Sequence, residues 1–303
     1  MKRFSALPGP GRRVVTFGAF DGIHLGHRAL INRAREGARL LGAEATVLTF
    51  EPHPARVLRP ASAPARITTL ADRAERIEAA GADSLVVLPF DASMAALSAE
   101  EFVGDVLVAG LGTVAVVTGP DQRFGRGRGG DAAGLVLLGL QHGFQVEMLR
   151  PVNVAGEPAS STRVRGLITD GRLAEANRVL GAPHRVSGVV VHGDHRGRTI
   201  GVPTANVAPE TEVLPANGVY ATRVRTPDGA WRSAVTNVGT RPTFEGDGVR
   251  IEAHLLDYEG DLYDQALSVD FVARIRTERR FDGLDALVAQ IQADIQRARE
   301  LLA

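Results

Sequence analysis

The sequence predicts an α/β domain built on a doubly wound parallel sheet, followed by an antiparallel β domain and a terminal helix. In the first half, short apolar runs alternate with stretches of helical length, which is typical of parallel strands joined by crossover helices. In the second half, short β-rich segments are separated by turn residues, which is typical of an antiparallel barrel or sandwich. With 303 residues, the chain can form two domains that each bury a core. We expect the boundary between residues 182 and 183, giving domains 1–182 and 183–303.

Five apolar runs are the expected strands of the first domain, and helical stretches separate them. The strands are predicted at residues 14–17, 45–50, 84–88, 113–117 and 145–149, and the helices at 26–41, 70–80, 98–109 and 131–142. Helices cover both faces of such a sheet. Ligands bind beyond the carboxyl ends of its strands, so we expect the polar motifs that follow the strands to gather at one edge.

In the second domain the expected elements are short β-rich segments separated by turn residues. Its strands are predicted at residues 186–192, 219–224, 233–238, 250–256 and 267–274. A final helix is predicted because Leu284, Leu287, Val288, Ile291 and Ile295 recur at helical spacing on one face. The helical stretch 172–180, closed by Gly181 and Pro183, is the expected join between the two domains.

Composition favours a cytoplasmic enzyme that acts on small molecules, without a nucleic-acid or membrane partner. The formal net charge is zero and 44% of the residues are hydrophobic, so no charge excess points to a polyanion. Cysteine is absent, which excludes disulfides and thiolate metal sites. The first residues lack the apolar core of a signal peptide, and no run reaches the roughly 18 apolar residues that span a bilayer.

Lys2 is the only lysine of the chain. A P-loop needs Gly-Lys followed by Ser or Thr, so this sequence cannot contain one. Schiff-base chemistry is equally unexpected. Any nucleotide chemistry would therefore rely on arginine, histidine, backbone N–H groups and a metal ion.

A strand end that leads into a histidine-bearing helix is the strongest functional signal. Residues 18–27 read Gly-Ala-Phe-Asp-Gly-Ile-His-Leu-Gly-His, directly after the first apolar run. A helix N-terminus offers unpaired N–H groups and a partial positive charge, and both His24 and His27 lie in its first turn. Because glycines surround them, we favour contacts to nucleotide phosphates. Metal ligation, which lacks an evident third ligand, and a structural role at the helix start are the alternatives.

A second candidate anion site comprises Ser160, Ser161, Thr162 and Arg165. The hydroxyls stand at a predicted helix start, and Arg165 follows them by one turn. A plain N-cap is the alternative interpretation. In combination with the histidine motif, we expect these residues to hold outgoing phosphates.

Residues 125–130 read Gly-Arg-Gly-Arg-Gly-Gly and match the pattern Gly-x-Gly-x-x-Gly. Residues 118–124 separate this run from the preceding strand, so a dinucleotide fingerprint is not expected. A basic loop that closes over phosphates is favoured, and a surface loop without function is the alternative.

Glycines recur at every fourth position in the segment 193–206 of the second domain. Glycine in a β-rich region permits close approach of a ligand. Thr204 and Asn206 offer neutral oxygen atoms that could hold Mg²⁺ already bound to nucleotide phosphates, while a glycine-rich barrel turn is the alternative. Glu252 stands in an alternating strand and by itself indicates only a solvent-facing carboxylate.

Taken together, these motifs resemble the bacterial bifunctional riboflavin kinase/FMN adenylyltransferase family, also called FAD synthetase, over nearly the whole chain. The first domain resembles the family's nucleotidyltransferase domain in residues 18–27, 50–54, 119–131 and 160–165. The second is similar to its riboflavin kinase barrel in residues 193–206, 214–220, 237–244, 252–258 and 276–281. Gly-x-Pro-Thr-Ala-Asn at 201–206 is specific to the kinase, whereas the histidine motif marks a broader superfamily.

The resemblance implies a Rossmann-like transferase domain, a kinase barrel, and a route from riboflavin through FMN to FAD that uses ATP and Mg²⁺. It implies that His24 and His27 act at the α-phosphate of ATP, that Glu252 is the base for the ribityl 5′-hydroxyl, and that Thr204 and Asn206 hold the metal. Nucleotide or phosphate contacts are expected from Gly18, Phe20, Asp21, Gly22, Gly26, Asp121, Ser160, Ser161, Thr162, Arg165, Gly193, Gly197 and Gly201. Flavin contacts are expected from Gly218, Val219, Tyr220, Arg276 and Phe281.

One departure from the family pattern keeps alternatives open. Gln122 stands where the family often has an aromatic residue, which predicts a weaker flavin contact in the first domain. The chain could therefore be a riboflavin kinase alone, with a first domain that is inactive or acts on another nucleotide or acceptor. A flavin-binding protein without activity is the third alternative, but a binder has no need of a base such as Glu252.

Overall fold

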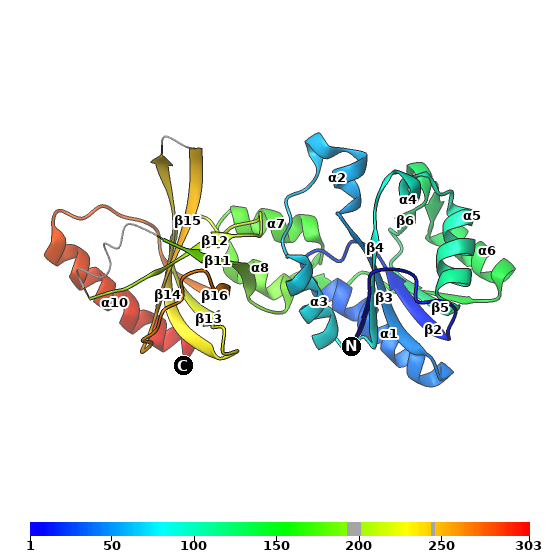
Figure 1. The fold of residues 1–303 in the computed structure, drawn as a ribbon, viewed down its shortest axis with the longest axis horizontal. Coiled ribbons are helices and arrows are strands. Elements are labelled where there is room, and N and C mark those ends of the chain that lie inside the picture. The colour runs from blue at the N-terminus through cyan, green and yellow to red at the C-terminus, as the bar shows by residue number, and fades with distance from the viewer. Residues whose placement is uncertain (193–200, 244–245) are drawn as a thin grey trace. The chain divides into compact units, whose positions relative to one another are not determined.

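The computed structural model describes residues 1–192, 201–243 and 246–303 of the chain. Contacts group these residues into two units, coloured along the chain in Figure 1. The first unit comprises Met1–Pro64 with Leu70–Ser160, and the second comprises Ala65–Thr69 with Ser161–Ala303. The domain boundary between residues 182 and 183 stays a prediction. Gly193 and Gly197 lie outside the described residues.

Six parallel strands form the sheet of the first unit. Their order across the sheet is β1 (Lys2–Phe4), β4 (Ser84–Pro89), β3 (Glu44–Glu51), β2 (Arg13–Phe17), β5 (Thr113–Thr118) and β8 (Gln145–Met148). The chain runs outward from β2 through β3 to β4, then returns to the other side of β2 with β5 and β8. The direction of winding therefore changes between β2 and β5, which is where open α/β sheets bind their ligands.

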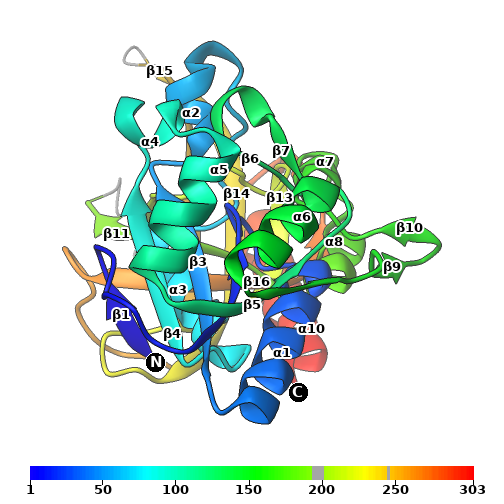
Figure 2. The same cartoon turned by 90° about the vertical axis from the view of Figure 1, so that its right-hand side faces the viewer.

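Helices cover both faces of this sheet, as Figure 2 shows. Side chains alternate along each strand, so neighbouring residues enter different apolar clusters. Val47 and Leu85 pack with α1 (Leu25–Leu41) and α3 (Leu70–Ala79), whereas Leu48 and Val86 pack with the opposite layer. That layer consists of the π-helix η2 (Phe102–Gly110) and α6 (Ala132–His142). The sheet is thus doubly wound, which confirms the predicted α/β class.

Local signals explain where most helices begin and end. α1 and α6 end at Gly42 and Gly143, which both adopt left-handed backbone conformations. The helix predicted over residues 98–109 begins with a capping box between Ser98 and Glu101 in α5 (Ala99–Glu101). It then continues as η2, a change of helix type that the apolar pattern did not predict. The remaining short elements of this unit are α2 (Pro54–Leu58), η1 (Pro60–Ser62), α4 (Ala92–Ala96), β6 (Arg123–Phe124), η3 (Arg126–Arg128), β7 (Gly130–Asp131), β9 (Asn153–Val154) and β10 (Glu157–Pro158).

The second unit contains a closed antiparallel barrel. The strands follow each other around the barrel in the order β11 (His184–Val191), β12 (Ala205–Pro209), β15 (Gly246–Leu255), β14 (Trp231–Thr243), β13 (Gly218–Arg225) and β16 (Ala266–Arg276). The prediction of an antiparallel barrel is therefore confirmed, and the alternative of a sandwich is wrong. Strand β12 was not predicted, because the segment 193–206 that leads into it was interpreted as a ligand-binding segment or a barrel turn.

Among the described residues of the second unit, three helices accompany the barrel. α7 (Ser161–Thr169) and α8 (Leu173–Leu180) precede the barrel, and α10 (Leu284–Leu302) follows it. Ala298 and Leu302 of α10 pack on Ala221, on the outer face of β13. The predicted apolar face of this helix is partly buried at residues 287–295, but Leu284 is exposed.

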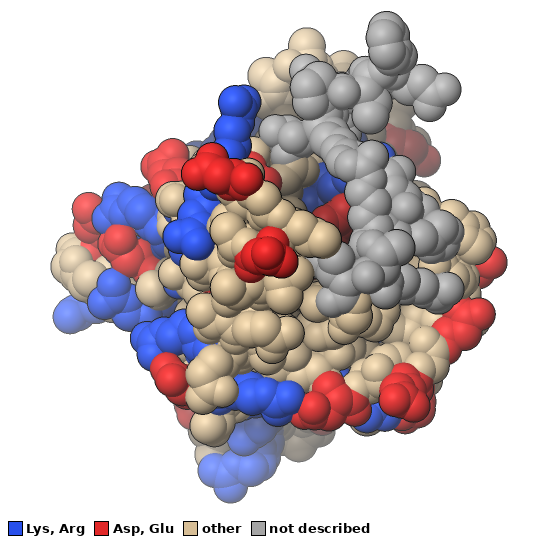
Figure 3. Space-filling model, turned by 90° about the vertical axis from the view of Figure 1, so that its left-hand side faces the viewer, with Lys and Arg blue, Asp and Glu red and all other residues tan. Residues whose placement is uncertain are grey.

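One face of the molecule carries mixed charge on its described residues. On the face shown in Figure 3, acidic and basic side chains are interspersed among uncharged ones. Within the described ranges, no helix has the length and apolar character needed to cross a membrane.

Candidate active sites

The loop between β2 and α1 has an unusual backbone. Gly18, Phe20, Gly22 and Ile23 all have positive φ angles, of 159°, 50°, 87° and 43° respectively. Positive φ is uncommon for a phenylalanine and a genuine outlier for a β-branched isoleucine. Both side chains are buried, 2% and 0% exposed, in the cluster beneath α1. Their burial offsets the backbone strain, so the loop is held in a conformation that it would not adopt alone.

His24 and His27 form one stacked unit at the start of α1. His24 is the N-cap residue, and its Nδ1 accepts a hydrogen bond from the backbone N–H of His27 (3.4 Å). The two ring centroids lie 3.7 Å apart with planes inclined by 22°. Because Nδ1 of His24 is an acceptor, the neutral ring carries its proton on Nε2.

His27 is a neutral imidazole at pH 7. Loss of hydration on burial, and secondarily the neighbouring His24 ring, hold the pKa of His27 well below its usual range. Its Nδ1 atom is buried and makes no hydrogen bond to any described residue. The Nδ1 atom of His27 is therefore an unsatisfied buried polar atom, which is expected of a group that hydrogen-bonds to a ligand when the site is occupied.

Gly26 leaves room for the stacked rings. A Cβ atom at this position would lie 3.1 Å from Cε1 and Nδ1 of His24, tighter than ordinary contacts. This glycine lies within α1, where glycine is otherwise unfavourable. The need for space beside His24 thus explains why the motif has glycine between its histidines.

A pocket of about 770 Å³ opens at the carboxyl edge of the parallel sheet. Loops that follow β2, β3, β4, β5 and β8 contribute to it, which confirms the predicted convergence at one edge. One part of its wall is apolar and includes Phe50, Phe90 and Phe102. Arginines outnumber acidic side chains around it, so the pocket suits an anionic ligand with a flat apolar group. Its charged and histidine lining residues are His24, His27, His53, Arg59, Arg123, Arg128, Arg150 and Asp121.

Most of the residues expected to bind nucleotide in the first unit line this pocket. Gly18, Phe20, Gly26 and Asp121 do so, as does Gln122. Gly125, Gly127 and Arg128 of the basic loop also line it. Asp21 and Gly22 are buried in the same β2–α1 loop but are not part of the lining.

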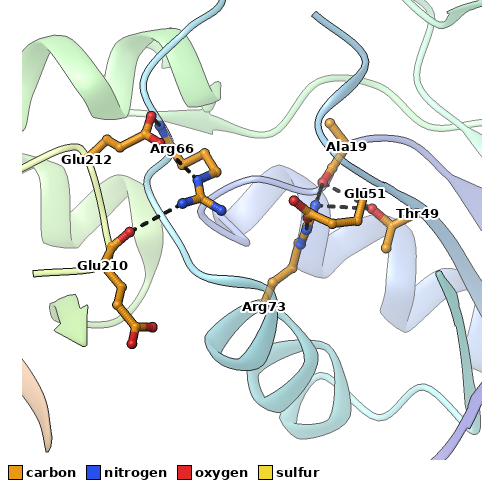
Figure 4. Close-up of polar contacts among 7 residues, drawn as sticks. All are labelled: Ala19, Thr49, Glu51, Arg66, Arg73, Glu210 and Glu212. Atoms are coloured by element: carbon orange, nitrogen blue, oxygen red, sulfur yellow. Dashed lines mark hydrogen bonds and ion pairs between the residues drawn. The ribbon is translucent and has the colours of Figure 1, made fainter. Parts of the chain in front are cut away.

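The hydroxyl motif begins a helix, as the sequence predicted. Ser160 ends the first unit, whereas Ser161, Thr162 and Arg165 stand on α7 of the second unit. Nε of Arg165 donates to the carbonyl oxygen of Ala65 (2.6 Å). Arg66, next in this segment, pairs with the Glu212 carboxylate through its Nε (3.1 Å) and donates to the Glu210 carbonyl oxygen (3.4 Å), as Figure 4 shows.

Several of the expected kinase residues lie in one row of directly paired residues that crosses neighbouring strands of the barrel, here called a rung. Asn206 of β12 pairs with Glu252 of β15, Glu252 pairs with Asn237 of β14, Asn237 pairs with Val219 of β13, and Val219 pairs with Arg276 of β16. Directly paired residues of antiparallel strands project from the same face of a sheet. Ala205 and Ile251, their sequence neighbours, fill the barrel core, so this row lies on the outer face. The sequence analysis placed Asn237 in the matching segment 237–244 but gave it no role, and strand pairing puts it beside Glu252.

His254 holds the segment that carries Thr204. It stands two residues after Glu252, on the same outer face of β15, and its Nδ1 hydrogen-bonds to the carbonyl oxygen of Pro203 (2.7 Å). Thr204 and Asn206 are both partly buried. No cluster of three or more metal-binding side chains of His, Asp or Glu occurs among the residues that the structure describes.

The residues expected to contact flavin occupy two environments. Val219 and Arg276 are paired on the outer rung, and the Phe281 ring lies 5.7 Å from the Arg276 guanidinium carbon. Tyr220 points instead into the core, where it is 0% exposed and donates from its hydroxyl to the Ala216 carbonyl oxygen. A Cβ atom on Gly218 would lie 2.7 Å from the Arg276 carbonyl oxygen, so close strand packing requires glycine there. Gly201 has a positive φ of 75° and open space around it.

Comparisons with known proteins cover both units. The family model described as FAD synthetase matches residues 8–163, and the model described as riboflavin kinase matches residues 180–302. A bifunctional riboflavin kinase/FMN adenylyltransferase of Pseudomonas fluorescens is 42% identical over 291 residues, which is 96% of this chain and 93% of that protein. Its counterpart in Escherichia coli strain K12 is 42% identical over 287 residues, covering 95% and 92% of the two chains. A solved structure described as a macrolide-efflux protein of Streptococcus pneumoniae has a TM-score of 0.87 at 34% identity and covers 98% of both chains.

Proposed function

The chain belongs to the bifunctional riboflavin kinase/FMN adenylyltransferase family, and from this premise we propose how its residues divide the two reactions. The protein phosphorylates riboflavin to FMN and adenylylates FMN to FAD, with ATP as the donor in both steps. We assign adenylyl transfer to residues 1–182 and the kinase reaction to residues 183–303. The observation that carries the kinase assignment is the direct pairing of Asn206 with Glu252 and of Glu252 with Asn237 on the outer face of the barrel, in a row that continues through Val219 to Arg276.

In the kinase step, Glu252 accepts the proton of the ribityl 5′-hydroxyl as its oxygen bonds to the γ-phosphorus of ATP. The bond between that phosphorus and the β–γ bridging oxygen breaks, and ADP leaves. Asn237 stands beside Glu252 in the same row, where its amide can orient the carboxylate or the hydroxyl. Phosphoryl transfer depends mainly on positioning and charge stabilisation, so a short row of polar groups is sufficient.

Thr204 and Asn206 fit a magnesium ion that arrives with ATP. Their hydroxyl and amide oxygens are the neutral hard ligands that Mg²⁺ accepts alongside phosphates and water. When bound, the ion supplies positive charge to the phosphate oxygens. His254 supports this site because it anchors Pro203, the residue before Thr204.

In the adenylyl step, a phosphate oxygen of FMN attacks the α-phosphorus of ATP, and the bond to the β-phosphate oxygen breaks to release pyrophosphate. His24 and His27 donate hydrogen bonds to the α-phosphate oxygens, on which negative charge increases in the transition state. Because His27 is neutral, it acts as a preorganised donor and not as a full positive charge. Ser161, Thr162 and Arg165 would hold the leaving pyrophosphate.

The flavin and nucleotide contacts complete the proposal. In the first unit, we place the FMN ring against the apolar part of the pocket near Gln122. In the second unit, Val219, Arg276 and Phe281 would contact riboflavin on the outer rung, with Tyr220 supporting them from the barrel core. We further propose that the reactions take place in the cytoplasm, where ATP is available, and that the partners are small molecules.

Product analysis with two variants tests the division of labour. Wild-type protein, riboflavin, Mg²⁺ and excess ATP should give FMN first and then FAD, resolved by chromatography over time. Glu252→Gln should fail to convert riboflavin to FMN but should still convert added FMN to FAD. His27→Asn should convert riboflavin to FMN but should fail to convert FMN to FAD. FMN that accumulates without FAD in the wild-type reaction would instead support a riboflavin kinase alone. Absence of both products would support a flavin-binding protein without activity.

A further inference from the structure

We propose that Arg73 is a positioning residue for adenylyl transfer, because it fixes the orientation of the peptide between Ala19 and Phe20 in the lining of the pocket. The inference rests on the adenylyl transfer proposed for the first unit. Arg73 lies on α3 and does not line the pocket, so it acts through the β2–α1 loop and not on the substrate.

Arg73 is buried, and its two terminal nitrogens donate to named partners, whereas its Nε has no hydrogen-bond partner among the described residues. The residue is 4% exposed. Its Nη1 donates to the Ala19 carbonyl oxygen (2.8 Å) and to Thr49 Oγ1 (3.4 Å), and its Nη2 donates to the Glu51 carboxylate. Figure 4 shows the guanidinium between these three residues. The Glu51 carboxylate compensates the buried positive charge, which would otherwise be costly.

The Ala19 carbonyl oxygen receives two hydrogen bonds. Besides Arg73, Thr49 Oγ1 donates to it at 3.2 Å. Thr49 belongs to β3 and is 0% exposed, so both donors come from fixed, buried positions. This arrangement determines which way the carbonyl points in a loop that has positive φ angles on both sides of it, at Gly18 and Phe20.

The same peptide presents an N–H in the opposite direction. In a planar trans peptide, the carbonyl oxygen and the following N–H point to opposite sides. With the Ala19 carbonyl bound to Arg73 and Thr49, the Phe20 N–H is directed away from them. Among the described residues, it has no hydrogen-bond partner, and both Ala19 and Phe20 line the pocket.

Arg73 therefore selects one of two orientations of this peptide. In the observed orientation, a free N–H is available to an anionic ligand. If the peptide rotated, the carbonyl oxygen would replace the N–H and repel phosphate oxygens. The network of Arg73, Thr49 and Glu51 thus determines whether the loop attracts or repels a phosphate.

A pair of matched threonine variants tests this inference. Thr49→Val removes one donor to the Ala19 carbonyl, and Thr46→Val removes an equally buried hydroxyl of the same strand that bonds to Ser84 instead (2.7 Å). We expect Thr49→Val to lower kcat for FMN adenylylation about threefold to tenfold, the value of one hydrogen bond. Thr46→Val should stay within about twofold of the wild type. Equal losses in both variants would show that general destabilisation is responsible and would overturn the inference.

Substitution of Arg73 itself gives the larger effect. Arg73→Met should lower kcat for adenylylation about a hundredfold through misplacement of the loop, with a smaller change in the KM for FMN. Arg73→Lys keeps the charge and one directed donor, so it should recover part of this loss. Adenylylation by Arg73→Met within about twofold of the wild type would contradict the proposal.

Riboflavin phosphorylation serves as the internal control for every variant. It should remain within about twofold in all four, because none of the substituted residues belongs to the second unit. If the wild-type protein formed no FAD, the proposed adenylyl function would fail before the role of Arg73 came into question. A wild type that forms FAD, with Arg73 and Thr49 variants that form it equally well, would reject the positioning role alone.

Discussion

The rings of His24 and His27 stack with centroids 3.7 Å apart, and His24 Nδ1 accepts the backbone N–H of His27. Burial, and secondarily the adjacent His24 ring, hold the pKa of His27 well below its usual range, so His27 is an uncharged imidazole at neutral pH. The stacked pair therefore offers N–H donors in fixed positions, unlike a flexible side chain that carries a full positive charge. This property suits the stabilisation of charge that develops on a phosphate, because the donors need no reorganisation when the reaction occurs.

Gly26→Ala is expected to impair adenylylation without destabilising the protein. Alanine favours the α1 helix by up to about 1 kcal/mol over glycine, but its Cβ would lie 3.1 Å from the His24 ring. The ring must shift, and the stack with His27 must shift with it. We expect kcat for FMN adenylylation to fall about tenfold or more, with unchanged riboflavin phosphorylation. An alanine variant with full adenylylation activity would show that the stacked geometry is not required.

The lowered pKa of His27 predicts that the first unit loses stability as the pH falls. Below a pH of about 6.5, the unfolded chain binds a proton at this histidine that the folded unit does not bind until the pH is much lower. The free energy of unfolding should therefore decrease from pH 7 to pH 5. His27→Gln, which cannot titrate, should show a weaker decrease.

Amide hydrogen exchange is the suitable measurement for this pH effect. The single tryptophan, Trp231, belongs to the second unit and cannot report on the first. Exchange of peptides from β2 and β3, measured at several pH values and corrected for the intrinsic rate, gives the opening free energy of the first unit. Parallel pH dependences in the wild type and His27→Gln would exclude His27 as the source.

The sequence predicted the parts of this fold that depend on local patterns. All five apolar runs of the first half are parallel strands, because a buried parallel strand is apolar along its whole length. The edge strand β1 was missed, since Lys-Arg-Phe carries no such pattern. The π-helical geometry of η2 was missed for a related reason: apolar residues mark a buried helix but do not distinguish its hydrogen-bond spacing.

The functional residues that were missed depend on non-local contacts. Asn237 joins Glu252 only because β14 and β15 pair in one particular register, which the sequence does not specify. Arg73 looks like any charged residue of an amphipathic helix, and its role follows only from its burial against Ala19, Thr49 and Glu51. In contrast, His24, Gly26 and His27 lie within one helical turn, so their relationship could be predicted from spacing alone.

Asn237→Leu is expected to affect the kinase reaction only. Leucine has a similar size but cannot hydrogen-bond to Glu252 or to a substrate hydroxyl. We expect kcat/KM for riboflavin to fall about tenfold, the value of one hydrogen bond near an ionised group, while FMN adenylylation stays unchanged. Steady-state kinetics of both reactions on the same preparation would check this. A kinase constant within about twofold of the wild type would remove Asn237 from the site.

Asp294→Asn tests whether α10 supports the riboflavin site through Arg276. Asp294 is 2% exposed and receives hydrogen bonds from Nε (3.0 Å) and Nη2 (2.8 Å) of Arg276 and from Gln290 (2.7 Å). Asparagine leaves the Arg276 charge without its buried partner, a change that costs about 3 kcal/mol. The barrel should unfold at a lower denaturant concentration, followed by Trp231 fluorescence, and riboflavin phosphorylation should weaken because Arg276 lies on the same rung as Glu252.

Asp257→Asn is the matched control, since Asp257 also tethers α10, through Arg299 (2.8 Å), but at the exposed surface. A solvent-exposed pair contributes little to stability, so this variant should unfold like the wild type and keep its kinase activity. If both variants lost stability and kinase activity equally, the loss of any ion pair that holds α10 to the barrel would explain the effect, without a specific role for Arg276. Only a selective effect of Asp294→Asn supports the assignment of Arg276 to the riboflavin site, because this carboxylate, unlike that of Asp257, orients a guanidinium on the rung of Glu252.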